Sequence, residues 1–520
     1  MNLLSSISMA TGTMKSIEAQ YALLSNNVSN ASTTGYVRET VATVAQVAGG
    51  IGVGSRLANT QLAVNQALQS TFYRQNATAS SYDTLNSSLS ALSAVQGSTS
   101  ADSGSTTSLS DQLGNLQSSL ISLTSTPSQS AAQSAVINNA TALTNTIHTL
   151  ASTYTTQRQA AADNVVSIVS SVNSDLTQIG ALSQQIIKFQ AKGQDTADLE
   201  NQRLGVMSDL SSSLSVTFST TSNGDMIVRT ENGVQLPTRP DQIGQDNNTQ
   251  TLPSSTWPLT TSSATIDSSN YYSAQDPNSV PAGIMLKGQD ITSSLTGGEL
   301  GANVSLRDSV YPQMQAQLDS FSYTMMNRVN SAGLSLFTTS SGGSSTVQST
   351  NLNLPSPQGI VGLSSTLSVN ATYAATPSLL VTTTNSDGTT NSNDTSVISK
   401  VLSVSFGSDP SDVSGSLLAP TSGLGPNGAL STGYSGSQGL LALSSALTSN
   451  QGATIASASS GLTSSTAVLT TLQTKIASTS GVVPNDELAK TVTLQAAYSA
   501  NAKIISIAQT MFSALINAIQ

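Results

Sequence analysis

The 520-residue sequence contains no cysteine, one histidine and few charged or aromatic residues. Without cysteine the chain forms neither disulfides nor thiolate metal sites, which suits a protein that passes between redox environments. His148, the single histidine, rules out a two-histidine metal site, and a catalytic triad would have to use this one residue. Charged residues make up 8% and aromatics 4%, so the surface is expected to be polar but largely uncharged. The 37% of hydrophobic residues predict slender layers rather than one thick core.

Charge and hydropathy exclude two kinds of partner. The formal net charge is −10, and Lys and Arg are nowhere clustered, so a phosphate backbone has no basic surface to bind. There is no run of some 20 apolar residues that would cross a membrane. The first ten residues lack Lys and Arg and space their apolar residues helically, unlike a cleaved secretory signal. Neither nucleic acid nor a membrane is an expected partner.

The two ends of the chain carry the clearest pattern. In 1–28 and in 486–520, mainly apolar residues recur at steps of three and four, which keeps one stripe of a helix facing a partner. Two such stripes at opposite ends of a chain can cover each other only if the termini come together. The alternative left open by periodicity is that each end is an amphipathic helix docked on a globular core.

Between the ends, helical and strand-like patterns alternate. Helices are predicted over 61–96, 111–123, 127–158 and 165–192, then over 312–331 and 440–476. Residues 26–35 form a predicted hinge, 37–47 fit either a strand or a helix, and Gly49–Gly54 is predicted to be a structural loop. Short strands with tight turns are predicted over 214–308, and further strand-like pieces at 379–381 and 401–406.

These patterns divide the chain into four predicted parts. The boundaries are 1–35 with 484–520 for a terminal helical assembly domain; 36–213, 309–336 and 437–483 for a helical rod domain; 214–308 for a β-rich domain; and 337–436 for an outer β-rich variable insertion.

Two terminal motifs resemble those of bacterial flagellar axial proteins, the rod, hook and hook-associated subunits. They are Asn26 to Arg38, which ends in Thr-Thr-Gly-Tyr-Val-Arg, and Gln495 to Ile505. Further motifs are similar to the hook-associated protein 1 subgroup, and they lie in order along the chain: the Pro-Ser-x-x-Ala-Ala start at 127, then 172–186, 198–203, 295–302 and 306–310. The sequence departs from the family where 57–68 lacks the usual Arg and Asp, and where Leu204 replaces an acidic residue.

The resemblance implies a multidomain α+β fold with paired terminal coiled-coil helices, an α-helical rod domain and β-rich outer domains. It also implies an assembly interface formed by the terminal stripes and the first motif. These residues are Leu3, Ile7, Met14, Ile17, Tyr21, Leu24, Val28, Asn30, Gly35, Tyr36, Leu494, Tyr498, Asn501, Ile505, Ala508, Phe512, Leu515 and Ile519.

The function implied is that of a structural subunit at the junction between flagellar hook and filament, secreted and extracellular, without catalysis or cofactor. Expected partners are identical subunits in a ring, the hook protein, a second junction protein on the filament side, an export chaperone and the flagellar type III export apparatus. A hook or distal-rod subunit shares both terminal motifs, but the helix series from 111 to 192 disfavours it because those relatives are mostly β outside their terminal helices. A Ser/Thr-rich surface adhesin is the alternative from another class, and an enzyme is a distant third.

Overall fold

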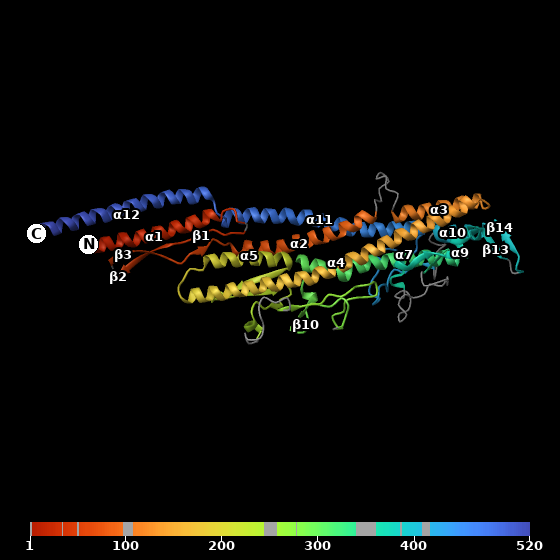
Figure 1. Cartoon of the computed structure of the whole chain (residues 1–520), viewed down its shortest axis with the longest axis horizontal. Helices are drawn as coiled ribbons and strands as arrows, with labels where there is room; N and C mark the ends of the chain where they lie inside the picture. The colour runs from red at the N-terminus through yellow and green to blue at the C-terminus, as the bar shows by residue number, and fades with distance from the viewer. Residues whose placement is uncertain are drawn as a thin grey trace.

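The protein is a long, narrow molecule whose two ends lie together at one tip (Figure 1). The computed structural model describes residues 3–33, 35–48, 51–96, 108–243, 257–276, 278–339, 360–384, 387–407 and 417–519. Helix α1 (Leu3–Ser29) and helix α12 (Pro484–Ile519) pack side by side and antiparallel, and α12 reaches further toward the tip. The terminal helices therefore pair with each other rather than dock separately on a globular core.

The segment after α1 folds into strands. β1 (Glu39–Thr40) pairs with β4 (Gln61–Leu62), and β2 (Thr43–Ala48) forms an antiparallel hairpin with β3 (Ile51–Leu57). The segment 37–47, which fitted either a strand or a helix, therefore forms strands, as its β-branched residues favour. The predicted Gly49–Gly54 loop is wrong from Ile51 onward, while Gly49 and Gly50 lie outside the described residues. β3 packs along α1, and glycine in a strand is typical where another element approaches closely.

The rod is built from long helices laid along one axis (Figure 1). They are α2 (Gln66–Gln96), α3 (Leu109–Ser125), α4 (Ser130–Ala191), α5 (Ala197–Ser213), α7 (Tyr311–Ser331) and α11 (Leu440–Ser480). The two helices predicted over 127–158 and 165–192 are one continuous helix of 62 residues. Neither Gly nor Pro lies between Arg158 and Val165, so nothing breaks the backbone hydrogen bonds there.

Two small antiparallel sheets flank the end of α4 nearer the terminal pair. One has the order β5 (Val216–Thr220), β6 (Met226–Thr230), β7 (Gln235–Leu236); the other has the order β10 (Gln289–Asp290), β9 (Met285–Leu286), β8 (Leu259–Thr260). Helix α6 (Gly298–Ser305) and a π-helical turn (Leu306–Val310) lead from them into α7. Val172 and Leu176 on α4 share a buried cluster with Val228 and Leu259 from the two sheets. The sheets are thus a layer on the rod.

The outer segment contains more helix than the sequence predicts. Its described residues include α8 (Leu363–Thr366), α9 (Ala371–Ala375) and α10 (Ser396–Phe406). They also include two antiparallel strand pairs, β11 (Phe337–Thr339) with β12 (Leu367–Val369) and β13 (Thr382–Thr384) with β14 (Thr390–Ser392). Two predicted strand-like pieces are wrong: 401–406 lies in α10, and 379–381 lies in a 3₁₀ turn (Pro377–Val381). Among the described residues of 337–436, helix outweighs strand. Ile398 and Val401 of α10 are buried with α3 and α7, so tertiary packing overrode the strand propensity of valine.

Candidate assembly interface

Helices α1 and α12 cover each other along one narrow stripe. Ala10, Ile17 and Leu24 of α1 are buried, as is Ala508 of α12. Leu494, Asn501 and Ile505 of α12 and Ile7, Met14 and Val28 of α1 are half-buried. A pair with so few buried apolar side chains gains little from its own contact, because hydrophobic stabilisation follows the area removed from water.

The remaining predicted interface residues lie at the edges of this stripe or beyond it. Tyr21 and Tyr498 are exposed on facing sides of the helix pair, and Phe512 and Leu515 are exposed further along α12. The side chains of Leu3 and Ile519 lie outside the described residues. The stripe read from the sequence therefore contains two surfaces, one that holds α12 to α1 and one that remains open.

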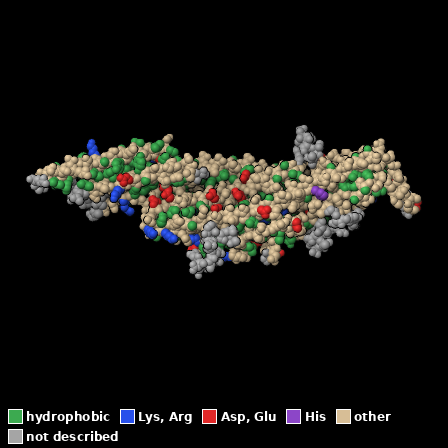
Figure 2. Space-filling model, viewed as in Figure 1, with side chains coloured by type: hydrophobic (Ala, Val, Ile, Leu, Met, Phe, Trp, Pro, Cys, Tyr) green, Lys and Arg blue, Asp and Glu red, His purple; other side chains and the backbone are tan. Residues whose placement is uncertain are grey.

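A second apolar stripe on α12 was missed by the sequence reasoning. Its members are Val492, Ile504, Ile507 and Met511, which are between 47% and 64% exposed and lie within about 120° of one another around the helix axis. Figure 2 shows hydrophobic side chains gathered at the end of the molecule formed by α1 and α12. The signal was present in the sequence, since 504, 507 and 511 follow the same three-and-four spacing as 494, 498 and 501. A contiguous exposed apolar surface marks an interaction site.

An open groove runs between the two helices. Its volume is about 720 Å³, and it is lined from α1 by Ile17, Glu18 and Tyr21 and from α12 mainly by Val492, Leu494 and Tyr498. Ile17 is buried at the base of the groove, whereas Tyr21, Val492 and Tyr498 are exposed around it. The groove is therefore a mainly apolar depression whose lining also contains Glu18, Gln495 and Ser499.

A buried polar cluster fixes the base of the helix pair. Asn27 is fully buried; its side-chain Nδ2 donates to the Glu39 carbonyl at 2.9 Å and to the Glu487 carboxylate at 3.4 Å. Its Oδ1 accepts from the Glu39 backbone N–H at 2.9 Å and from the Tyr36 hydroxyl at 3.1 Å. Glu487 is 1% exposed and also accepts from Lys490 at 2.8 Å. Asn27 thus joins the end of α1, the strand after it and the start of α12.

Two predicted residues shape the turn beside this cluster. The side chain of Asn30 donates to the Asn26 carbonyl at 3.1 Å, one turn back, and so closes the end of α1. Gly35 has φ of +80°, a left-handed conformation that glycine adopts without steric cost. Asn30 and Gly35 therefore shape the backbone around the helix pair.

The same region is attached to the rod through the first turns of α5. Asn201 exchanges two hydrogen bonds with the backbone of Val37, at 2.9 and 3.0 Å, and donates to the Glu39 carboxylate at 3.2 Å. Asn26 donates to Asp198 at 3.0 Å. Burial raises the pKa of Glu39, and the negative charge of Asp198 raises it further. Burial and nearby carboxylates likewise raise the pKa of the Tyr36 hydroxyl. Part of the 198–203 motif thus holds the terminal helices to the rod.

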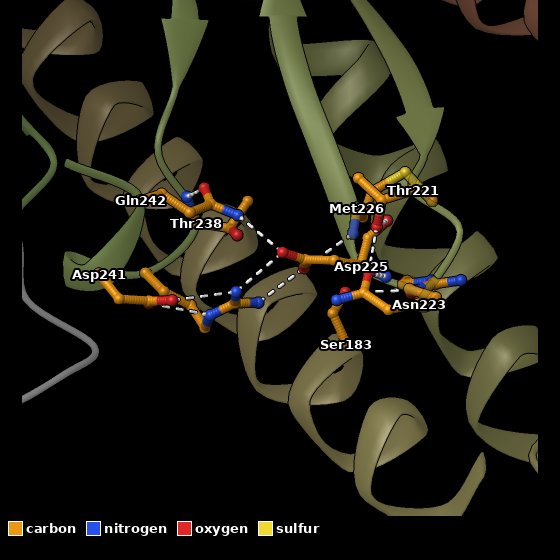
Figure 3. A network of polar contacts seen from close by, with 11 residues as sticks. Ser183, Thr221, Asn223, Asp225, Met226, Thr238, Asp241 and Gln242 are labelled. Carbon is orange, nitrogen blue, oxygen red and sulfur yellow. Dashed lines mark hydrogen bonds and ion pairs between the residues drawn. The ribbon is translucent and has the colours of Figure 1, made fainter. Parts of the chain in front are cut away.

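The polar clusters elsewhere have structural roles. The side chain of His148 contacts the Leu367 carbonyl at 2.6 Å, tying the outer segment to α4. In Figure 3, Asp225 lies between Gln242 and the backbone of Met226; it also accepts two hydrogen bonds from Arg239, at 2.6 and 2.8 Å. Burial opposes ionisation of Asp225, but the arginine outweighs it and lowers the pKa. The described residues contain no cluster of three or more His, Cys, Asp or Glu side chains suited to a metal ion.

Comparisons with known proteins place this architecture in a family. Residues 100–343 match the helical domain of the flagellar hook-associated protein FlgK. Residues 473–518 match the C-terminal family of the flagellar basal body rod proteins FlgEFG. The chain is therefore a flagellar axial protein. Its helical domain is of the type that is found in the flagellar hook-associated protein FlgK.

The chain was also compared with solved structures and with curated proteins. The flagellar hook junction protein FlgK from Burkholderia pseudomallei is 22% identical, with a TM-score of 0.40 over 53% of this chain and 45% of that one. No curated protein matches the chain. Among the described residues, no helix is both long and apolar enough to span a bilayer.

Proposed function

We propose that the chain is a structural subunit of the hook–filament junction of the bacterial flagellum and works without catalysis. The observation that carries this proposal is the terminal helix pair with its uncovered apolar stripe, on a chain with a FlgK-type helical domain. A protein that works alone in water covers such a stripe; a subunit of an axial structure covers it on assembly.

The proposal includes specific partners. Identical subunits form a ring through the terminal pair, with the hook protein on one side and a second junction protein on the other. The chain reaches this place through the flagellar type III export apparatus with an export chaperone, and it remains outside the cell in the flagellum. The sparse burial between α1 and α12 supports this route, because a weakly packed pair is readily left unfolded until it assembles.

The four predicted domains are kept in this proposal with one change. The terminal pair assembles, the helical rod and its flanking sheets set the length of the subunit, and the segment 337–436 is an outer cover of mixed helix and strand. A hook or distal-rod subunit shares the C-terminal match over 473–518, but the FlgK-type match over 100–343 favours the junction role.

Deletion of the gene tests the function. Cells without the protein should carry hooks that lack filaments and should release flagellin into the medium, and the full chain should restore filaments. Filaments of normal number and length in the deletion strain would refute the junction role. Loss of the hook itself would indicate a rod or hook subunit instead.

A further inference from the structure

Helix α12 carries an uncovered apolar knob at its far end. From Met511 to Ala518 every side chain is exposed, and Met511, Phe512, Leu515 and Ile516 retain 46% to 59% of their accessible surface. The helix carries no charged residue after Lys503. In Figure 1 this end of α12 extends past the start of α1, which cannot cover it. We call residues 511–516 the knob.

The groove lined by Tyr21, Val492 and Tyr498 is the matching concave surface on the same molecule. It is open, about 720 Å³ in volume and mainly apolar, with Glu18 as its one charged lining residue. The groove and the knob lie on one continuous helix, separated by the 17 residues from Tyr498 to Leu515, which is about 25 Å along the axis. An unbroken helix cannot fold back on itself, so a knob never reaches the groove of its own chain.

We propose that the knob of one copy occupies the Tyr21–Tyr498 groove of a second copy. The inference rests on the proposed self-assembly and names the contact by which one subunit binds the next. Both surfaces are mainly apolar, and the knob brings no charge of its own into the groove. Glu18, the one charged residue in the lining, is exposed, so docking is expected to leave its carboxylate in contact with water. Because knob and groove are different patches, each copy uses one of each. Such a head-to-tail contact continues from copy to copy and produces a ring or tube rather than a closed dimer.

The natural absence of cysteine permits a direct test on the full-length chain. One preparation carries Leu515→Cys in the knob, and two others carry Val492→Cys or Tyr498→Cys in the groove. Each groove variant is mixed with the knob variant at a concentration where the protein self-associates, and the mixture is oxidised. Disulfide-linked dimers are then quantified under non-reducing conditions, with mass spectrometry to identify the pair. The matched control replaces the groove variant by Ile121→Cys, an exposed isoleucine on α3.

The proposal expects at least one knob–groove mixture to cross-link ten times faster than the knob–Ile121 mixture, and faster than either partner alone. Faster Leu515–Leu515 cross-linking would indicate a symmetric dimer of knobs and would overturn the proposal. Equal rates for groove and control positions would overturn it as well. Failure here is distinguishable from failure of the junction role: if cells producing the Cys variants still make filaments while no knob–groove dimer forms, the function stands and this contact is wrong.

Discussion

Replacing Ile507 by aspartate tests whether the outward stripe of α12 is the surface used in assembly. Ile507 is 53% exposed, so about half of its side chain still faces water in the single chain. Complete burial of an isoleucine contributes about 1.5–3 kcal/mol, so roughly 1 kcal/mol remains to be gained in each subunit contact. A carboxylate buried there without a partner costs several kcal/mol more. Together these give a loss on the order of 4 kcal/mol, or about a thousandfold in the contact's equilibrium constant.

A matched control separates assembly from folding. Ile121 on α3 is 50% exposed, so Ile121→Asp removes a similar amount of apolar burial from the single chain. Each substitution is expected to lower the free energy of unfolding by no more than about 1 kcal/mol. Only Ile507→Asp should prevent assembly, because only α12 belongs to the proposed interface.

The assay uses secretion, thermal melting and filament counts in cells that produce either variant in place of the natural chain. Both proteins should appear in the medium with near-natural melting temperatures; the Ile121 variant should support filaments, and the Ile507 variant should leave bare hooks. Normal filaments on the Ile507 variant would refute the assignment of this stripe. A collapse of its melting temperature would mean that Ile507 belongs to the core of the single chain.

Three further results are expected. Burial and a neighbouring aspartate raise the pKa of Asp175 to about 7. Since the pKa in the unfolded chain is about 3.9, the folded chain gains stability as the pH falls from 7 toward 4 and loses stability as the pH rises. Asp175→Asn should remove roughly 1 kcal/mol of this pH dependence, measured by denaturant titrations at pH 5 and 8. Arg328 is fully buried and donates to carbonyl oxygens at 2.7 and 2.8 Å, so Arg328→Met should lower the free energy of unfolding in urea by about 2–4 kcal/mol. Arg229 is exposed, so Arg229→Met should not lower it. Export should occur without cleavage, because a cut after residue 20 would remove buried Ala10 and Ile17; a shortened N-terminus in the intact mass of the secreted protein would contradict this.

The sequence by itself determined the helical frame, and the terminal motifs favoured pairing of the two ends over separate docking. Stripes at steps of three and four depend on residue spacing along one chain, so they are readable without a structure. The motif at 26–38 marked the hinge, and the structure shows what it does there: Asn27, fully buried, binds both Glu39 and Glu487. The role of Glu487 cannot be predicted from its neighbours in the sequence, because its partner Asn27 lies 460 positions away.

Only the tertiary structure decided which face of α12 remains free. Apolar residues lie on more than one side of this helix, and periodicity cannot tell the side that α1 covers, with Ile505 and Ala508, from the side that stays exposed, with Ile504 and Ile507. The same limit explains 401–406: its valines favour a strand locally, but burial of Val401 beside α3 and α7 fixes a helix. Spacing identifies a stripe, whereas the neighbour that covers it is a property of the folded chain.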